Sequence, residues 1–106
     1  MNKQGFLVAM SIIAGSAAVS AQSSSYMTEA MDMQKQMMMH MTMKPSGNPD
    51  KDFVMMMIPH HQGAIDMAQL ELKYGKDPEL KALAESIIRA QDKEIAQMKA
   101  WQKKMN

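Results

Sequence analysis

Residues 49–67 read PDKDFVMMMIPHHQGAIDM and place three consecutive methionines just ahead of two adjacent histidines. Met56 and His60 are four residues apart, and so are Met57 and His61, a spacing that brings side chains together on one side of a helix. Thioether sulfur binds soft ions such as Cu(I), and imidazole binds copper as well as zinc, nickel and iron. The stretch therefore predicts a helix that carries a site for a soft metal ion.

The two histidines are neighbours in the sequence, so their side chains leave an undistorted helix about 100° apart. His60 and His61 therefore do not easily chelate one ion. Two arrangements stay open: one histidine faces the main site while the other borders it, or the two belong to neighbouring sites. Pro59 removes a backbone hydrogen bond just before them, because its ring nitrogen carries no hydrogen. The resulting bend either aims the histidines at a third helix or is a plain kink without functional meaning.

The helix around this stretch is expected to span about residues 48–74, with Asn48 or Asp50 as its first cap and Gly75 as its last. On a helical wheel, one side of it gathers most of the apolar residues and is expected to be buried. The members of that side are Phe53, Met57, His60, Ala64, Met67, Ala68 and Glu71, flanked by Met56 and His61.

A first helix is expected over residues 26–43, with Ser25 as its cap, after a disordered leader at residues 22–25 and before a linker rich in Pro, Gly and Ser. Two interpretations of its methionines stay open, because methionine fills irregular core gaps and is also a metal ligand. Met39 and Met43 fall on the polar side of this helix. They are expected to act either as mobile metal ligands or as part of an apolar patch that docks a partner. The opposite side carries an amphipathic stripe of Tyr26, Ala30, Met33, Met37, His40 and Met41.

A third helix is expected to begin at Pro78, with Asp77 as its cap, and to run to the end of the chain. Gln91 and Glu94 interrupt its apolar side, and such groups need partners when they are buried. The histidine pair is the expected partner, so that both residues would orient imidazole N–H groups. Alternatively, Glu94 lies at the edge of the stripe and reaches water. The full stripe is Leu80, Leu83, Ile87, Ala90, Gln91, Glu94, Met98, Trp101 and Met105.

The chain of 106 residues begins with a short polar segment, an apolar run at residues 5–19 and small residues up to Ala21. This order is typical of a secretory signal peptide at residues 1–21. An uncleaved membrane anchor is the alternative, although the run is shorter than the roughly 20 residues of a spanning helix. Cleavage leaves one domain, residues 22–106, in the periplasm or outside the cell, without stable membrane insertion. Its parts are a Met-rich helix and linker at 22–47 and a helical hairpin with the Ile-Pro-His-His motif at 48–106.

Charge and composition narrow the class of partner. Without Lys3 the expected mature chain has 11 basic and 11 acidic residues, so neither a polyanion nor a nucleic acid is implied as a partner. It has no cysteine, so stability must come from helix packing, an oligomer partner or a bound ion. It also has 14 Met against 4 Leu, the reverse of ordinary usage. The methionines are therefore expected to do more than fill a core.

The sequence lacks the motifs of common enzymes. It has no His-Glu-x-x-His zinc motif, no Glu-x-x-His pair for a di-iron centre, no Gly-rich phosphate loop and no credible Ser-His-Asp set. We therefore expect no enzymatic turnover. The rival hypothesis, in which the protein is an enzyme, is a copper-dependent oxidoreductase, which needs an open coordination position on the metal.

The string DFVMMMIPHHQGAIDMA, followed by YGKDPEL, resembles an exported Met/His-rich domain family, largely of unknown function, that includes the periplasmic copper-binding protein CopM of cyanobacteria. Ile88, Gln91, Glu94, Ile95, Met98 and Trp101 extend the likeness, which covers residues 48–102. The resemblance implies a helical bundle of the ferritin-like superfamily, a periplasmic location, and binding of Cu(I) or Ag(I) in copper tolerance. The metal-binding residues it implies are Met56, Met57, His60, His61 and Met67, with Gln91, Glu94 and Met98 facing them.

Together these features predict an all-α, up-and-down, ferritin-like bundle of three mature helices, with a homodimer able to supply packing that three helices lack. The expected function is to bind Cu(I), or else Ag(I) or Cu(II), and to sequester it or pass it to another copper carrier or efflux component. The rival function is a Met-rich helical module that grips a protein partner without a metal. The expected primary ligands are Met56, Met57, His60 and His61, with Met67 and Met98, and the auxiliary cluster is Met33, Met37, His40 and Met41.

Overall fold

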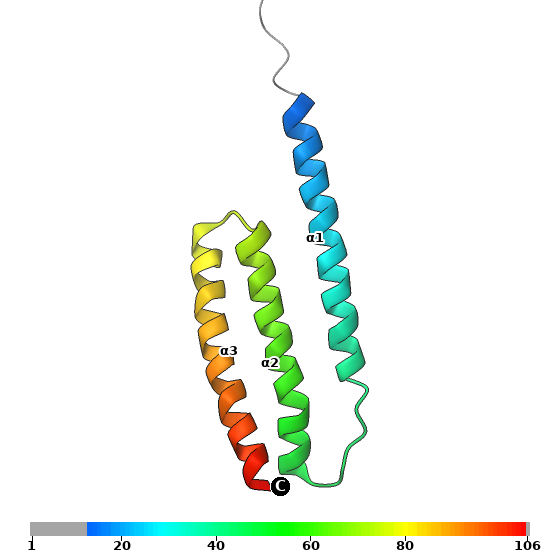
Figure 1. Cartoon of the computed structure of the whole chain (residues 1–106), viewed down its shortest axis with the longest axis vertical. Coiled ribbons are helices and arrows are strands. Elements are labelled where there is room, and N and C mark those ends of the chain that lie inside the picture. The colour runs from blue at the N-terminus through cyan, green and yellow to red at the C-terminus, as the bar shows by residue number, and fades with distance from the viewer. Residues whose placement is uncertain (1–12, 106) are drawn as a thin grey trace, which may run out of the picture.

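The computed structural model describes residues 13–105, with side chains from residue 21 onward. Three α-helices follow one another: α1 (Ile13–His40), α2 (Pro49–Tyr74) and α3 (Pro78–Met105), and the described residues contain no strand (Figure 1). The prediction of an all-α chain is confirmed. Residues 1–12 of the expected signal peptide lie outside the described residues, and the remainder of that segment forms the first turns of α1. None of the described helices is long and apolar enough to cross a membrane.

The first helix differs from the prediction at both ends. Residues 22–25 are helical and not a disordered leader, so Ser25 lies inside α1 and does not cap it. The Thr28 hydroxyl donates a hydrogen bond to the Ser24 carbonyl oxygen over 3.1 Å, one turn earlier, as serine and threonine do within helices. The helix ends at His40 and not at residue 43, and the Met41 amide closes it with a hydrogen bond to the Met38 carbonyl oxygen over 3.2 Å.

The second helix begins at the cap that its sequence predicts. The side chain of Asn48 accepts hydrogen bonds from the amides of Asp50 and Lys51, over 3.1 and 3.3 Å, so Asn48 is the N-cap. At the other end the Gly75 amide donates to the carbonyl oxygen of Glu71 over 2.7 Å. Gly75 has φ −68° and ψ 155°, so it closes the helix with an extended backbone and not with a left-handed one. The helix continues through Pro59.

The third helix also begins as predicted. The Asp77 carboxylate accepts hydrogen bonds from the amides of Glu79 and Leu80, over 2.9 and 3.1 Å, and Pro78 occupies the first helical position. Asp77 therefore satisfies two of the backbone N–H groups that every helix leaves free at its start. The turn 75–77 between α2 and α3 is short, so the two helices form an antiparallel hairpin.

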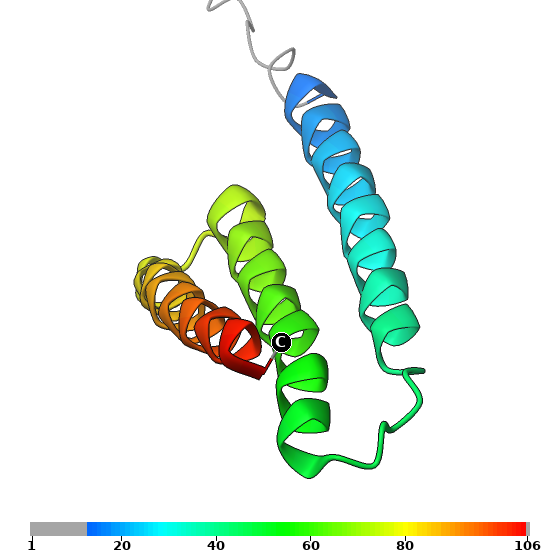
Figure 2. The same ribbon diagram turned by 60° about the horizontal axis from the view of Figure 1, so that its bottom comes forward.

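The three helices lie side by side in one layer with α2 in the middle (Figure 2). Within the described residues α2 packs against α3 and α1 packs against α2, whereas α1 and α3 make no contact. The described residues therefore form one open layer, in which the two outer helices do not contact each other.

The buried side of α2 agrees only in part with the side that the helical wheel predicts. Ala68 of the expected buried side is buried, whereas Phe53 and Met67 are 60% and 48% exposed. His60 is exposed and His61 is buried. The reason is that a helix in the middle of a layer has neighbours on two opposite sides, so that one predicted stripe cannot be buried along its whole length. The buried apolar residues are Val54, Ile65 and Ala68 of α2 and Ala84 and Ile95 of α3.

Candidate metal centre

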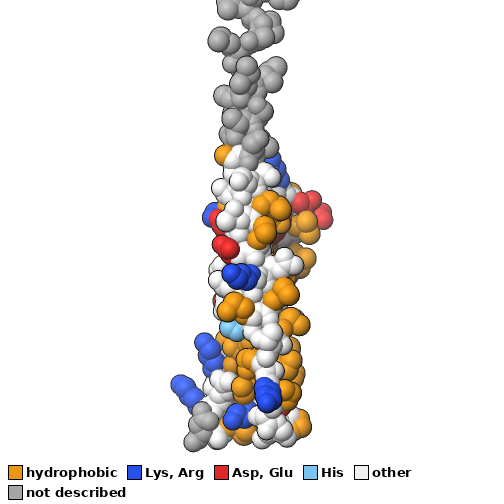
Figure 3. All heavy atoms as spheres, turned by 90° about the vertical axis from the view of Figure 1, so that its right-hand side faces the viewer, with side chains coloured by type: hydrophobic (Ala, Val, Ile, Leu, Met, Phe, Trp, Pro, Cys, Tyr) orange, Lys and Arg blue, Asp and Glu red, His pale blue; other side chains and the backbone are white. Residues whose placement is uncertain are grey.

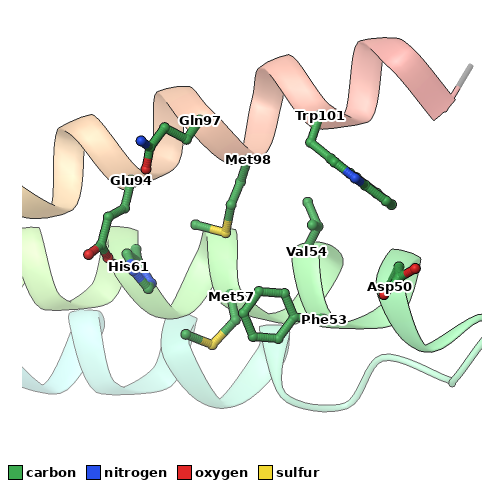
Figure 4. Close-up of a pocket in the computed structure, with 9 residues that line it drawn as sticks. All are labelled: Asp50, Phe53, Val54, Met57, His61, Glu94, Gln97, Met98 and Trp101. Atoms are coloured by element: carbon green, nitrogen blue, oxygen red, sulfur yellow. Dashed lines mark hydrogen bonds and ion pairs between the residues drawn. The ribbon is translucent and has the colours of Figure 1, made fainter.

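A cavity of about 600 Å³ lies between the first half of α2 and the second half of α3 (Figure 4). Both helices contribute side chains to it, because the antiparallel hairpin brings the start of α2 beside the end of α3. Its lining is largely apolar and includes two methionines, one histidine and one glutamate. The lining residues are Asp50, Phe53, Val54, Met57, His61, Glu94, Gln97, Met98 and Trp101.

His61 and Glu94 form an ion-pair or hydrogen-bond contact across this cavity, from the ring Nε2 to the carboxylate Oε2. The His61 side chain is 8% exposed and that of Glu94 is 51% exposed, so the contact lies at the edge of the packed region. An ionised carboxylate only accepts hydrogen bonds, so the neutral imidazole must carry its proton on Nε2. The opposite nitrogen, Nδ1, then has a free lone pair.

That Nδ1 atom is buried and has no hydrogen-bond partner. Buried polar atoms nearly always have partners, so an unpaired one calls for an explanation. A metal-binding histidine usually donates its other N–H group to a carboxylate, which fixes the tautomer and the ring orientation. The contact of His61 with Glu94 has this arrangement, and it leaves Nδ1 as the nitrogen able to bind an ion.

Two thioether groups lie in the same cavity as His61. Met57 comes from α2 and Met98 from α3, and both line the cavity; the Met98 side chain extends from α3 toward α2, whereas the Met57 side chain extends toward the α1 side of α2 (Figure 4). Phe53 and Trp101 form apolar walls beyond them. The cavity thus offers one imidazole nitrogen and two sulfurs, a donor set that favours a soft ion such as Cu(I).

A second, smaller cavity of about 120 Å³ lies between α1 and α2. It brings three of the four residues of the expected primary site together with three of the four residues of the expected auxiliary cluster. Met57 lines both cavities, and the His60 and His61 rings have centroids 6.1 Å apart. The lining residues of the second cavity are Met37, His40, Met41, Met56, Met57, Pro59 and His60.

The two histidines therefore line neighbouring cavities, His61 between α2 and α3 and His60 between α1 and α2. The predicted ligands Met33 and Met67 join neither site. Met33 lines a separate polar cavity beside Asp32 and Lys73, and Met67 is 48% exposed. Gln91 makes no hydrogen bond to a histidine; its Oε1 is buried without a partner. Phe53 and Trp101 were not predicted as parts of the site, although both lie on the predicted apolar stripes.

Two contacts position α1 beside the second cavity. Gly63 lies under Met37, because a Cβ atom on Gly63 would be 3.0 Å from the Met37 Cγ and Cε atoms. Farther along, the Glu29 carboxylate accepts hydrogen bonds from Lys73 Nζ and the Tyr74 hydroxyl, over 2.6 and 2.7 Å. These bonds fix the register in which the histidine of α1 reaches the His60 side of α2.

The Glu29 contact also changes the charge properties of its members. The hydrogen bond from Lys73, followed by that from Tyr74, lowers the pKa of Glu29 below its ordinary value. The hydrogen bond that Lys73 donates to the carboxylate raises the pKa of Lys73, and the one that the Tyr74 hydroxyl donates to Glu29 raises the pKa of Tyr74. The Tyr26 ring packs edge-to-face on Tyr74, with centroids 5.5 Å apart.

Carboxylates take little part in either candidate site. Among the described residues, no three His, Asp or Glu side chains gather closely enough to hold a metal ion. Both cavities therefore combine imidazole with thioether sulfur, and Glu94 contacts an imidazole nitrogen. This chemistry differs from the oxygen-rich sites that hold hard ions.

The fold and the site define a small all-helical protein with methionine and histidine clusters on both sides of its middle helix. The chain belongs to the DUF305 family, described as a domain of unknown function, which matches residues 7–102. It is also 45% identical over 49 residues to the uncharacterized protein L153 of Acanthamoeba polyphaga mimivirus. The matched segment is 46% of this chain and 32% of the viral protein, so the chain spans about a third of the length of that relative.

Proposed function

We propose that this chain is an exported, periplasmic Cu(I)-binding protein that takes part in copper tolerance, by sequestering the ion or by handing it to another carrier or an efflux component. The observation that carries the proposal is the buried, unpaired Nδ1 atom of His61, a residue that lines one cavity together with Met57 and Met98. The resemblance to exported Met/His-rich proteins, including CopM, supports the same function. Ag(I), a soft ion with the same charge, is expected to compete with Cu(I) for the same ligands.

The residues around His61 have distinct roles in this proposal. Glu94 accepts a hydrogen bond from the Nε2–H group, which holds the ring in one orientation and makes its free nitrogen more basic. The two methionines supply neutral sulfur ligands that carry no proton to lose. Phe53 and Trp101 shield the site from part of the solvent. A neutral, partly enclosed set of nitrogen and sulfur donors stabilises Cu(I), a singly charged soft ion.

The second cavity supplies a route by which the ion is handed on. His60 and Met41 are exposed, with 74% of Met41 accessible, so an ion held there is open to exchange with a partner. Met57 borders both cavities and connects them. We therefore assign storage to the His61 side and exchange to the His60 side.

Competition for Cu(I) against a calibrated chelator tests this function. Four proteins are compared: the wild type, His60→Ala, His61→Ala and the double variant, with Gln62→Ala as a control on the exposed polar side of the same helix. The expected results are two ions bound by the wild type, one by each single variant and none tightly by the double variant. Equal affinity of the wild type and the double variant would refute the assignment.

A second function is favoured by one observation. Several methionines of α1 face solvent and line neither cavity with a histidine, among them Met31, Met38 and Met39, which are 63%, 64% and 64% exposed. Flexible Met-rich surfaces bind partner helices in other proteins. If the chain is such an interaction module, Cu(I) will leave its melting temperature unchanged.

A further inference from the structure

The first helix is held less firmly than the other two. Among the described side chains of α1, none is buried and only four are half-buried. The buried apolar residues described above all belong to α2 and α3. Because helices in proteins gain most of their stability from packing an apolar side on their neighbours, α1 gains little in this way. The half-buried residues of α1, which lie on one side of the helix, are Glu29, Ala30, Met33 and Met37.

The hydrogen bonds that hold α1 to α2 lie far from the second cavity. They join the Glu29 carboxylate to Lys73 and Tyr74. The side chains of Glu29 and Lys73 are 41% and 58% exposed, and ion pairs in contact with solvent contribute little stability. Toward the other end of α1, Met37 packs over Gly63, and beyond that contact the two helices border the second cavity.

The second cavity combines metal-binding groups from both helices. Met37 and His40 come from α1, and Met41 follows directly after the last residue of that helix. Met56 and His60 come from α2. Each helix thus supplies one imidazole and at least one thioether. The cavity volume of about 120 Å³ exceeds the roughly 30 Å³ of a water molecule, so one ion fits. Seen from the α1 side, hydrophobic side chains gather beside a histidine at the surface (Figure 3).

We propose that a soft metal ion in the second cavity clamps α1 onto α2, so that α1 is docked when this site is loaded and opens when the ion leaves. The inference rests on the proposed function, because it requires an ion to bind there. An ion with ligands on both helices binds the docked arrangement more tightly than the open one. It must therefore shift the equilibrium toward the docked arrangement. The His61 site is lined by α2 and α3 alone and needs no such movement.

The clamp gives the exchange site a way to release its ion in steps. When α1 opens, an ion that stays on α2 keeps ligands such as Met56 and His60 and loses His40. Ligands on one helix hold an ion less tightly than ligands on two, because the second set no longer acts at a high effective concentration. A carrier that brings its own ligands then takes the ion over more readily. Opening of α1 is thus the regulated step of exchange.

Amide hydrogen exchange tests this inference, with Ag(I) as the probe because it binds the same soft ligands and is not oxidised by air. In the metal-free protein, the amides of residues 26–40 are expected to exchange about 10-fold or more faster than those at the centres of α2 and α3. A free Ag(I) concentration 100 times the dissociation constant is expected to slow the exchange of residues 26–40 by up to about 100-fold, since the ion lowers the open population by that factor. Native mass spectrometry of the same samples counts the bound ions.

Two variants separate the clamp from metal binding as such. His40→Ala removes the imidazole that α1 supplies to the cavity. It is expected to retain one ion, at the His61 site, and to lose the slowing of exchange in α1. Met39→Ala removes a neighbouring thioether that is 64% exposed and does not line the cavity. This control is expected to bind two ions and to show the same slowing as the wild type.

The inference is overturned if the wild type binds two ions while α1 exchanges at the same rate with and without them. It is also overturned if α1 slows as much in the His40 variant as in the wild type. Both results leave the proposed function in place, because the ions are counted independently of exchange. A chain that binds no Ag(I) would instead refute the proposed function, and this inference with it.

Discussion

The tautomer of one imidazole ring decides whether His61 can bind a metal. Its Nε2 atom contacts the Glu94 carboxylate, and its Nδ1 atom is buried without a partner. Because a carboxylate has no proton to donate at neutral pH, the ring proton stays on Nε2 and the lone pair on Nδ1. The metal affinity of His61 is thus linked to the chemical nature of residue 94.

Glu94→Gln is expected to weaken Cu(I) binding at the His61 site by about 10-fold or more. The amide group of Gln can donate to Nε2, which moves the ring proton to Nδ1 and blocks the binding nitrogen. Competition titration measures the constant, and Glu85→Gln, an exposed glutamate on the same helix, is the control. An unaltered constant in the Glu94 variant would mean that this residue only reaches water, the other interpretation open from the sequence.

The contact of α1 with α2 depends on a residue without a side chain. Gly63 leaves room for Met37, whose Cγ and Cε atoms would lie 3.0 Å from an added Cβ atom. α1 supplies Met37 and His40 to the second cavity, and Met41 follows directly after its last residue, so displacement of α1 would dismantle that site. The first cavity, between α2 and α3, does not depend on α1.

Gly63→Leu is therefore expected to separate α1 from α2, at a cost of about 1–3 kcal/mol for overpacking. Amide hydrogen exchange in α1 should speed up, and the number of tightly bound Cu(I) ions should fall from two to one. Gln62→Leu adds the same side chain at an exposed neighbouring position and serves as the control. Loss of the His61 site in the Gly63 variant would contradict the independence of the two cavities.

The second anchor of α1 should depend on pH. The lowered pKa of Glu29 means that its contact with Lys73 and Tyr74 contributes stability above the ordinary glutamate pKa, and that the contribution is lost as pH falls through the lowered value. The raised pKa of Lys73 means that its share is lost only as pH rises through that value. The anchor is thus strongest near neutral pH.

Thermal unfolding of the wild type and Glu29→Gln at a series of pH values measures this dependence. The difference in melting temperature should be largest near pH 7 and should shrink in acid, where the wild-type carboxylate becomes protonated. Asp32→Asn, an exposed acid on the same helix without a hydrogen bond of its side chain in the structure, provides the comparison. A difference that stayed constant from pH 7 to pH 3 would exclude an electrostatic anchor.

The whole molecule has a small buried core, so ligand binding should have a large effect on its stability. A free Cu(I) concentration 100 times the dissociation constant adds about 2.7 kcal/mol to the free energy of unfolding. For a domain of this size, the melting temperature is then expected to rise by on the order of 10 °C. The double variant His60→Ala/His61→Ala should show no such rise. A wild type that melts at the same temperature with and without Cu(I) would favour the interaction module.

Local features of the fold could be predicted from the sequence because they depend on neighbouring residues. Asn48 and Asp77 cap α2 and α3 through hydrogen bonds to amides two and three residues ahead. The predicted start of the first helix was wrong. Ser25 is a suitable cap residue, but the helix already includes the Ala-rich segment before it and continues past Ser25. The contact of Glu94 with a histidine could be predicted as well, since a polar residue on an apolar stripe needs a partner.

The sequence by itself determined three helices, the caps at the starts of α2 and α3, and the gathering of methionine and histidine around the middle helix, because all of these follow from short-range spacing. Only the tertiary structure decided which histidine is buried and that the two serve separate cavities. A helical wheel shows which residues share a side, but not how many neighbours the helix has or on which sides they lie. Because α2 lies between α1 and α3, members of its most apolar stripe border both neighbours, Phe53 on the α3 side and His60 on the α1 side. The directions of those neighbours are set by contacts far apart in the chain.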